Sequence, residues 1–478
     1  MLTRDEFQTI YDQGPDAVFL LLPALQQQID LLTARVNDLE ARLDKDSHNS
    51  HKPPSSDGLS KKPVSLRPHT GRKPGGQRGH EGSTLTLSDT PDALVFHTPL
   101  ACSHCGSTLD PAQAQETGQR RQVLDLPPLR LLVTEHRTQA CACPLCGEHT
   151  SGTFPVEVSH PVQYGSRVAG LGVYLSAFQL LPVARIATFF ADVFAAPLST
   201  GTLAAFTARA ALGLVPVCQQ IQSALRSAPV VHCDETGLRS AGKLHWLHSA
   251  GTDTLTHYFP HEKRGKVGMD AAGILPHLQG TVVHDGWASY GAYGCRHALC
   301  NVHHLRELTA LAEDGHDWAK ATRSLLAQMH QAVAKAKARG QSRLPVRLEA
   351  KFEGEYRRLL TLGWKANPPP VPPAKKRRGR VKQSAARNLL ARLEQGEAAV
   401  LRFLHDFCVP FDNNLAERDV RMMKVKQKIS GCFRTLRGAE AFCRIRSYVS
   451  TMRKQGQSLL AALQHVCEGN PLQPQFHA

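Results

Sequence analysis

Residues 229–240 read PVVHCDETGLRS, an apolar run that ends on Asp234 and then turns polar. Two more strand-like stretches follow, KLHWLHSAG at 243–251 and TLTHYFPH at 254–261. Short apolar stretches of this kind, separated by turns, are typical of neighbouring strands. The pattern therefore predicts a three-stranded antiparallel meander with Asp234 on its first strand.

A helix and two further strands are predicted after the meander. GKVGMDAAGIL predicts the helix, GTVVHDGWASY contains a strand that ends on Asp285, and CRHALCNVHHLREL predicts a strand that leads into a helix. This order of elements is that of ribonuclease-H-like domains, in which the first and fourth strands are neighbours. We therefore expect an α/β core with a mixed five-stranded sheet that places Asp234 and Asp285 within metal-sharing distance.

Two acids at such a place suit metal-dependent chemistry on a phosphodiester. In-line displacement develops charge on the attacking and leaving oxygens, and two Mg²⁺ ions about 3.5–4 Å apart stabilise both. A third carboxylate is expected from a later helix, and Glu417 suits this role because it lies in a predicted first turn, where the helix dipole favours an acid. The neighbouring acids Glu235 and Asp419 are expected to face away. The candidates for the N-cap of this helix are Asp412, Asn413 and Asn414.

The helix that carries Glu417 is also rich in basic residues. We interpret them as contacts to DNA phosphates beside the metals, while a merely solvated face remains the alternative. The candidates are Arg418, Arg421, Lys424, Lys426, Lys428 and Arg434.

The whole chain is basic, with 57 Lys and Arg against 41 Asp and Glu and a formal charge of +16. This excess favours a polyanionic partner, because each neutralised phosphate releases counterions. The chain lacks a phosphate-cradling GxxxxGK[ST] loop, so an ATP-driven motor is not expected.

The N-terminal residues predict a helix with a heptad seam, followed by a linker. The seam favours a short coiled coil and self-association, although an amphipathic helix packed on its own protein fits the same pattern. The seam residues are Leu22, Leu25, Ile29, Leu32, Val36, Leu39 and Leu43. Residues 46–92 are rich in Pro, Gly, Ser and basic side chains, which predicts a disordered linker that also touches DNA.

Two CxxC pairs predict a zinc site. Cys102 and Cys105 form one pair and Cys143 and Cys146 the other, each followed by a glycine, and such pairs present two thiolates to one tetrahedral Zn²⁺. Residues 123–140 between them are interpreted as strands around a turn, which makes a zinc ribbon. Cys141 is a competing ligand, and reduced buried cysteines without a metal are the alternative to a zinc site. The chain has thirteen cysteines and no visible signal peptide, so a reducing cytoplasm is expected.

Two helical regions complete the prediction. Residues 182–210 read as a helix, a break at Ala195–Pro197 and a second helix capped by Ser199 or Thr200, which is either a DNA-reading helix-turn-helix or a plain helical hairpin. Residues 313–402 read as a helical insertion with a basic loop around Pro368 to Arg380.

With these residues placed, the chain resembles the transposases of the insertion sequence 66 family over nearly its full length. The matching stretches are SHKPPSSDG, GGQRGHEG, the paired CxxC motifs, VHCDETGLR, VHDGWASY, CNVHHLREL and DNNLAERDVRMMKVKQKISGCFRT. The resemblance implies that Asp234, Asp285 and Glu417 form a DDE triad that uses two Mg²⁺ or Mn²⁺ ions. It also implies cutting at the ends of a mobile element and joining of the free 3′-hydroxyl to target DNA. His303 and His304 are expected either to orient phosphate or a metal-bound water, or simply to pack.

The resulting organisation has seven parts: a helix or short coiled coil at 1–45, the linker at 46–92, a zinc ribbon at 93–158, a helix-turn-helix-like domain at 159–228, a catalytic core at 229–312 and 403–455, the insertion at 313–402 and a tail at 456–478. The expected partners are terminal inverted repeats, target DNA, further copies of the chain and accessory proteins of the same element. No membrane association is expected, and the expected location is the bacterial cytoplasm, at the nucleoid. Two other functions remain open: a non-catalytic DNA-binding regulator or domesticated relic, and a structure-selective nuclease.

Overall fold

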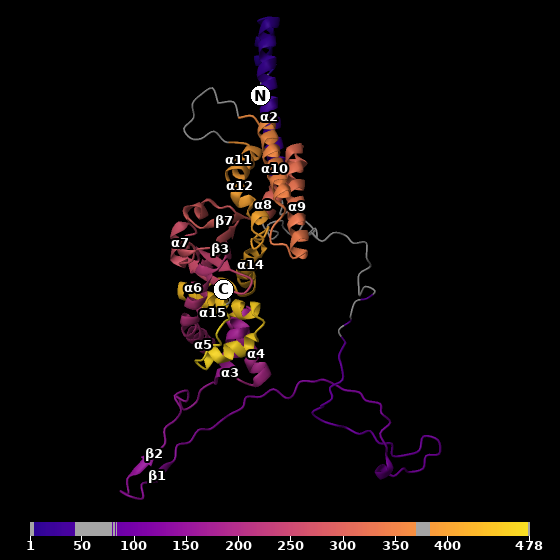
Figure 1. Ribbon diagram of the computed structural model, residues 1–478, viewed down its shortest axis with the longest axis vertical. Helices are drawn as coiled ribbons and strands as arrows, with labels where there is room; N and C mark the ends of the chain where they lie inside the picture. The colour runs from indigo at the N-terminus through magenta and orange to yellow at the C-terminus, as the bar shows by residue number, and fades with distance from the viewer. Residues whose placement is uncertain (1–3, 44–78, 80–81, 83, 370–382, 477–478) are drawn as a thin grey trace.

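The computed structural model describes residues 4–43, 79, 82, 84–369 and 383–476 (Figure 1). Most of the basic linker expected at 46–92 lies outside these residues, and so does most of the basic loop expected around Pro368 to Arg380. In Figure 1 the central sheet lies between two helical groups, and residues 84–160 extend away from that body.

The centre of the molecule is the mixed five-stranded sheet that the sequence predicts. Its strands run in the order β5-β4-β3-β6-β7, with β3, β4 and β5 antiparallel and β3, β6 and β7 parallel. The strands are β3 (Val230–Ser240), β4 (Lys243–Gly251), β5 (Thr256–His261), β6 (Thr281–His284) and β7 (Arg296–Leu299). The predicted meander and the pairing of the first and fourth strands are thus confirmed.

The register of β3 and β6 places the two aspartates level with each other. His232 on β3 pairs with Val283 on β6, and each aspartate lies two residues further along its chain, Asp234 within β3 and Asp285 directly after β6. Side chains two residues apart on a strand share a face, and neighbouring strands lie about 4.8 Å apart. The two acids therefore lie near each other, just beyond the point where the pairing of β3 with β6 ends.

Helices cover the sheet and carry the remaining site residues. Helix α14 (Asn414–Ser430) packs against β3 and β4, and α15 (Leu436–Lys454) packs against β5. Helix α7 (Lys266–Ala272) lies beside β4 and β5, and α8 (Asn301–Glu313) follows β7 directly. The first turns of α8 and α14 come from distant parts of the sequence and reach the same end of the sheet.

The helices before the sheet share its hydrophobic core. They are α3 (Ser166–Val173), the π-helical turn η3 (Tyr174–Phe178), α4 (Val183–Phe194), α5 (Thr200–Gly213) and α6 (Val215–Ser227). The expected break is present: Ala195 ends α4 in the left-handed conformation, and the Ser199 hydroxyl accepts a hydrogen bond from the Thr202 amide at 3.0 Å. The exposed residues of α5 are mainly Ala204, Ala205, Ala208, Arg209 and Leu212. Thr200 at the start of α5 is exposed as well, and the choice between a DNA-reading helix-turn-helix and a plain helical hairpin stays a prediction.

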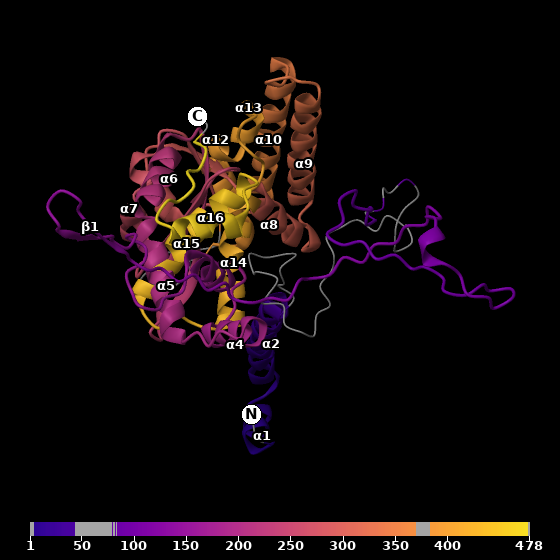
Figure 2. The ribbon, with the colours of Figure 1, turned by 90° about the horizontal axis from the view of Figure 1, so that it is seen from below.

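The stretch expected as an insertion forms helices with a second hydrophobic core. Tyr356, Leu389 and Leu390 are fully buried in it, and Leu308 of α8 joins them. Figure 2 shows the long helices standing to one side of the sheet. The helices are α9 (Asp317–Ala338), α10 (Val346–Ala366), α11 (Ala385–Gln395), α12 (Glu397–Val400) and α13 (Arg402–His405).

The C-terminal residues differ from the expected tail. They contain α16 (Leu459–Cys467), in which Ala462 and Leu463 are fully buried. This helix packs closely on α3, since a Cβ on Gly170 would lie 3.0 Å from Gln464. An apolar helix face with a partner becomes part of the core, so the expectation of a tail is wrong.

The zinc segment also differs from its prediction. The structure gives a short hairpin, β1 (Ala140–Ala142) with β2 (His149–Ser151), and places no strand in residues 123–139. Apolar side chains there are exposed, with Leu132 at 86% and Val133 at 87%. Strand propensity takes effect where a sheet neighbour or a packed face is available, and of the apolar residues here only Leu131 packs against the core.

The N-terminus is helical in α1 (Arg4–Asp12) and α2 (Pro15–Leu43). Among the described residues no single helix is long and apolar enough to span a membrane. The bent pair of α5 and α6 meets the length and composition requirement only when both are taken together, with an angle of 49° between them.

Candidate active site

The two aspartates are held by backbone amides next to them in the chain. Asp234 accepts a hydrogen bond from the Glu235 amide at 2.8 Å, and Asp285 accepts one from the Trp287 amide at 3.0 Å. Burial, followed by the nearby charges of Glu235 and Asp285, raises the pKa of Asp234 to about 8. A bound cation would stabilise the charged form of such a carboxylate.

Glu417 lies in the first turn of α14, as predicted. Its Oε1 atom is buried and has no hydrogen-bond partner, and the His303 Nε2 atom lies 3.8 Å away. Burial raises the pKa of Glu417, and the nearby charges of Asp412 and Asp285 contribute in the same direction. An orphaned buried oxygen close to two further acids fits a divalent cation, because Mg²⁺ takes carboxylate oxygens as ligands.

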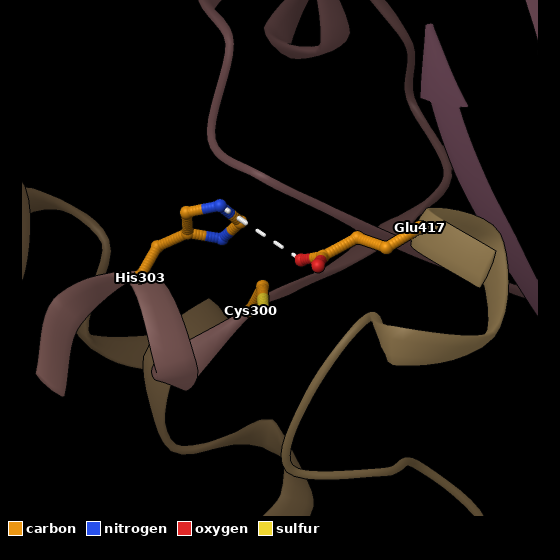
Figure 3. Close-up of side chains that lie close together, drawn as sticks. All are labelled: Cys300, His303 and Glu417. Carbon is orange, nitrogen blue, oxygen red and sulfur yellow. Dashed lines mark ion pairs between the residues drawn. The ribbon is translucent and has the colours of Figure 1, made fainter. Parts of the chain in front are cut away.

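Cys300, at the N-cap of α8, and His303, in its first turn, lie beside Glu417 (Figure 3). The Cys300 sulfur, a ring nitrogen of His303 and a Glu417 oxygen all lie within 4.8 Å of one another. Of the two histidines singled out in the sequence, His303 faces the site and His304 is buried, with its Nδ1 atom 3.2 Å from the Asn301 side-chain oxygen. Cys300 was not among the predicted site residues, although the spacing Cys300-x₂-His303 at the start of a helix signals one shared face.

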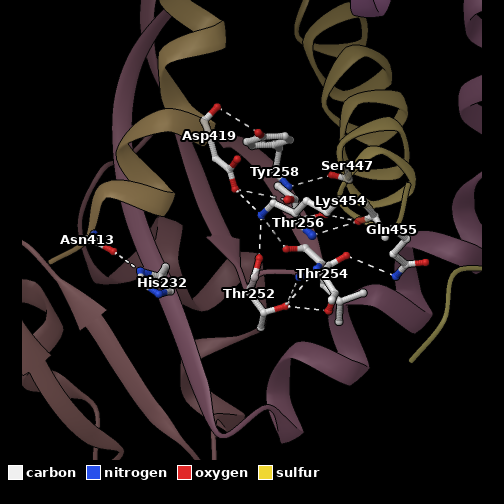
Figure 4. Close-up of polar contacts among 12 residues, drawn as sticks. His232, Thr252, Thr254, Thr256, Tyr258, Asn413, Asp419, Ser447, Lys454 and Gln455 are labelled. Atoms are coloured by element: carbon white, nitrogen blue, oxygen red, sulfur yellow. Dashed lines mark hydrogen bonds and ion pairs between the residues drawn. The ribbon is translucent and has the colours of Figure 1, made fainter. Parts of the chain in front are cut away.

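Asn413 connects the elements that carry the acids. Its side chain donates to the Cys233 carbonyl at 2.8 Å and lies 2.9 Å from the His232 ring (Figure 4), while its backbone amide donates to the Cys300 sulfur at 3.2 Å. Its carbonyl accepts from the Glu417 amide at 3.2 Å. Asn413 stands at the N-cap position of α14 without capping it through its side chain. The expected capping role is therefore replaced by a link between β3, α8 and α14.

Asp419 faces away from the site, as expected, and lies beside Lys454 and Tyr258 (Figure 4). It forms an ion pair of 2.8 Å with Lys454 of α15, and both side chains are at most 17% exposed. Lys454 also donates to the carbonyls of Thr252 and Leu255. This cluster holds α14 against β5 and α15, so that the other side of the helix presents Glu417.

Glu235 points away from Asp234, also as expected. It is buried against the Tyr290 hydroxyl and forms an ion pair of 3.5 Å with Arg264. The Arg264 guanidinium lies over the rings of Trp246 and Trp287, at 5.0 Å and 4.1 Å from their centroids. Glu235 thus has partners of its own and is not a metal ligand in our interpretation.

The basic residues of α14 divide according to the helical period. Arg421, Lys424 and Lys428 lie 4, 7 and 11 positions after Glu417, which places them on its face at 3.6 residues per turn, and all three are exposed. Lys424 also donates to the Gly237 carbonyl at 2.8 Å. Lys426 lies on the opposite face, so its assignment as a DNA contact is wrong: it is buried, donates to the Gly431 carbonyl at 2.8 Å and sits 3.9 Å over the Phe433 ring.

The other predicted DNA contacts, Arg418 and Arg434, are exposed. Arg306 of α8 was not predicted, but it lies close enough to Glu417 to lower its pKa. It adds a cation to this end of the sheet.

The two cysteine pairs form matching turns. In the first, the Cys102 amide donates to the Ser107 carbonyl and the Gly106 amide to the Cys102 carbonyl; in the second, Cys143 and Gly147 repeat both bonds. Both glycines have positive φ, 76° and 75°, which glycine adopts without strain. The Ser107 hydroxyl lowers the pKa of Cys105 to about 7, and amides of Cys146 and Leu145 lower that of Cys143.

These turns suit zinc, but the structure keeps them apart. Among the described residues, no three sulfur atoms of these two CxxC pairs lie within 4.8 Å of one another. The predicted four-cysteine site is therefore present as two separate halves.

Comparison with known families finds three matches. The transposase IS66 family matches residues 162–441, and the zinc-finger binding domain of transposase IS66 matches residues 99–147. A family of unknown function matches residues 4–86, and no curated protein matches the chain. The chain belongs to the IS66 family of transposases.

Proposed function

We propose that the chain is a DDE transposase that cuts DNA at the ends of a bacterial insertion sequence and joins the 3′-hydroxyl ends to target DNA. The observation that carries this proposal is that Asp234 on β3 and Asp285 directly after the adjacent parallel strand β6 lie near each other, with a Glu417 oxygen that has no hydrogen-bond partner nearby. The strand order β5-β4-β3-β6-β7 is that expected of a ribonuclease-H-like core.

The three carboxylates would hold two Mg²⁺ or Mn²⁺ ions, which stabilise charge on the attacking and leaving oxygens. The protein orients these acids through backbone amides at Asp234 and Asp285 and through Asn413 at Glu417. The exposed basic face of α14 would hold DNA phosphates next to them. Arg418 and Arg434 extend the basic surface beyond that face.

The segment 99–147 would hold one structural Zn²⁺ when its two cysteine turns converge. Helix α2 exposes Leu25, Ile29, Leu32 and Val36 of the heptad seam, at 41–60% each. A second copy of α2 would cover them, so we propose a homo-oligomer on DNA. A cytoplasmic, nucleoid-associated location and a need for accessory proteins of the element are part of the same proposal.

The test is strand transfer by the full-length protein on DNA that carries the element's terminal inverted repeats, in Mg²⁺. The expected result is joined product from wild type and a loss of at least about 10³-fold in Asp234→Asn, Asp285→Asn and Glu417→Gln, since each removes a metal ligand. Asp192→Asn, at an exposed position of α4, is the control for loss of a carboxylate outside the site. Folded triad variants that join DNA at the wild-type rate would refute the assignment.

The same assay separates the other candidate functions. Specific binding of the ends without cleavage in either metal would indicate a DNA-binding regulator. Cleavage of branched DNA without joining would indicate a structure-selective nuclease.

A further inference from the structure

One group of potential metal ligands lies next to the proposed triad and shares only Glu417 with it. Cys300 lies at the N-cap of α8, His303 follows in its first turn, and Glu417 reaches them from α14 (Figure 3). Among the described residues this is the one group of three His, Cys, Asp or Glu ligand atoms that meet within 4.8 Å. The oxygens of Asp234 and Asp285 do not complete such a group with Glu417.

The chemistry of the three ligands selects a particular class of ion. A thiolate, an imidazole and a carboxylate suit Zn²⁺ and related borderline ions, whereas Mg²⁺ takes hard oxygen ligands. Zinc bonds of about 2.0–2.3 Å in a tetrahedron put ligand atoms about 3.3–3.7 Å apart. The present group needs a contraction of only about 1 Å, within the reach of side-chain rotation. A fourth position would stay open, as in three-ligand zinc sites.

One contact beside Cys300 favours a metal-bound thiolate, whereas burial of the side chain disfavours the free thiolate. The Cys300 side chain is 1% exposed, and its sulfur already accepts a hydrogen bond from the Asn413 amide at 3.2 Å. Outer hydrogen bonds of this kind orient metal ligands and favour their charged form. Glu417 contributes a buried oxygen that has no hydrogen-bond partner.

We propose that Cys300, His303 and Glu417 form a second site for a zinc-like divalent ion, separate from the cysteine turns of residues 99–147, and that an ion there withdraws Glu417 from Asp234 and Asp285. The consequence for catalysis rests on the proposed transposase function. A carboxylate committed to zinc at this site is not available to the Mg²⁺ pair, so zinc acts as an inhibitor that competes for Glu417.

The binding test uses full-length protein loaded with Zn²⁺, dialysed and measured for metal content, and a parallel sample loaded with Co²⁺ for its thiolate absorption band. Cys300→Ser and His303→Gln are each expected to lose one equivalent of metal while keeping that of the cysteine turns. Cys143→Ser should lose the other equivalent, and Cys408→Ser, at an exposed cysteine, should lose none. Circular dichroism and melting curves establish that each variant is folded. Wild-type metal content in folded Cys300→Ser and His303→Gln would overturn the proposal.

The activity test measures strand transfer in Mg²⁺ with added Zn²⁺. The zinc concentration that halves the rate is expected to rise by about 10-fold or more in His303→Gln, since even outer-shell changes weaken metal sites by about 10–100-fold. Equal zinc sensitivity in wild type and this variant would overturn the competition for Glu417. If wild type joins no DNA at all, the proposed function fails while the metal-content result still decides the site.

Discussion

Asp234, Asp285 and Glu417 bring negative charge into a partly buried corner, and in the absence of a cation this opposes folding. The pKa of Asp234 rises from 3.8 to about 8, mainly through burial. A raised carboxyl pKa means that the folded state binds a proton more tightly than the unfolded state. The loss of folding stability that the charged Asp234 causes is therefore absent below pH about 4. It grows as the pH rises and is complete above about 8.

Asp234→Asn is accordingly expected to stabilise the protein in the absence of added Mg²⁺ while it abolishes strand transfer. The expected gain at pH 7 is about 1–3 kcal/mol, because a neutral amide of the same shape replaces a desolvated carboxyl. Thermal melting at pH 5 and pH 7 measures it, and the gain should be smaller at pH 5. Asp192→Asn, at an exposed position of α4, is the control. A destabilised variant at pH 7 would contradict the electrostatic argument.

Asn413 stabilises the site through its neighbours. Asn413→Ala leaves the Cys233 carbonyl and the His232 ring without this partner, and an unsatisfied buried polar group costs about 1–3 kcal/mol. We expect lower stability and a lower rate of strand transfer with DNA affinity nearly unchanged. Asn414→Ala is the matched control, because the adjacent Asn414 is exposed. Equal effects of the two substitutions on melting and rate would exclude the positioning role.

At the scale of the element, α14 has one face for chemistry and one for packing. Arg421 lies on the face of Glu417 and Lys426 on the opposite face. Arg421→Ala should reduce the slope of log affinity for DNA against log salt concentration by about 1, the value of one phosphate contact. Lys426→Met should leave that slope unchanged and lower the melting temperature. A reversed pattern in the salt titration would contradict the division of the helix.

The packing face depends on the ion pair between Asp419 and Lys454. Lys454→Met leaves the Asp419 carboxylate buried without its cation, and breaking such a pair costs about 2–3 kcal/mol at this degree of burial. Denaturant unfolding should register this loss. The double variant with Asp419→Leu should recover part of it, because both charges are then absent. No recovery would show that Lys454 acts through its bonds to the Thr252 and Leu255 carbonyls instead.

At the scale of the molecule, the described residues form two large hydrophobic cores, and most of the zinc segment lies outside both. The sheet shares one core with α3–α6, α15 and α16, and α9–α11 build the second around Tyr356. Most apolar side chains of residues 84–133 are exposed, including Leu94, Val95 and Phe96. The zinc segment should therefore lose its metal without unfolding the rest of the molecule.

Cys146→Ser tests that independence. We expect it to lose the zinc of the cysteine turns and to gain protease sensitivity within residues 99–147, with the main melting transition unchanged. Cys141→Ser is the matched control, because Cys141 stands outside both CxxC turns, and it should retain the metal. Loss of the main transition in Cys146→Ser would mean that the segment supports the core after all.

The amino-acid sequence by itself determined the elements whose signals are local. The succession of strands and helices along the chain, Asp234 within β3, Asp285 directly after β6 and Glu417 in a first turn all followed from apolar runs and helix starts. The break before Ser199 followed from turn chemistry. Such features depend on residues within a few positions of one another, so a single sequence contains them.

Tertiary structure decided the features that depend on distant partners. Glu417 lies about 130 residues after Asp285, and only the packing of α14 on β3 brings it to the aspartates. Asn413 became a link to Cys233 and Cys300 rather than a cap, and α16 became core because α3 covers it. Residues 123–139 formed no strand, and of their apolar side chains only Leu131 packs against the core. In each case the deciding free energy comes from contacts between segments far apart in the chain, and local sequence patterns do not encode such contacts.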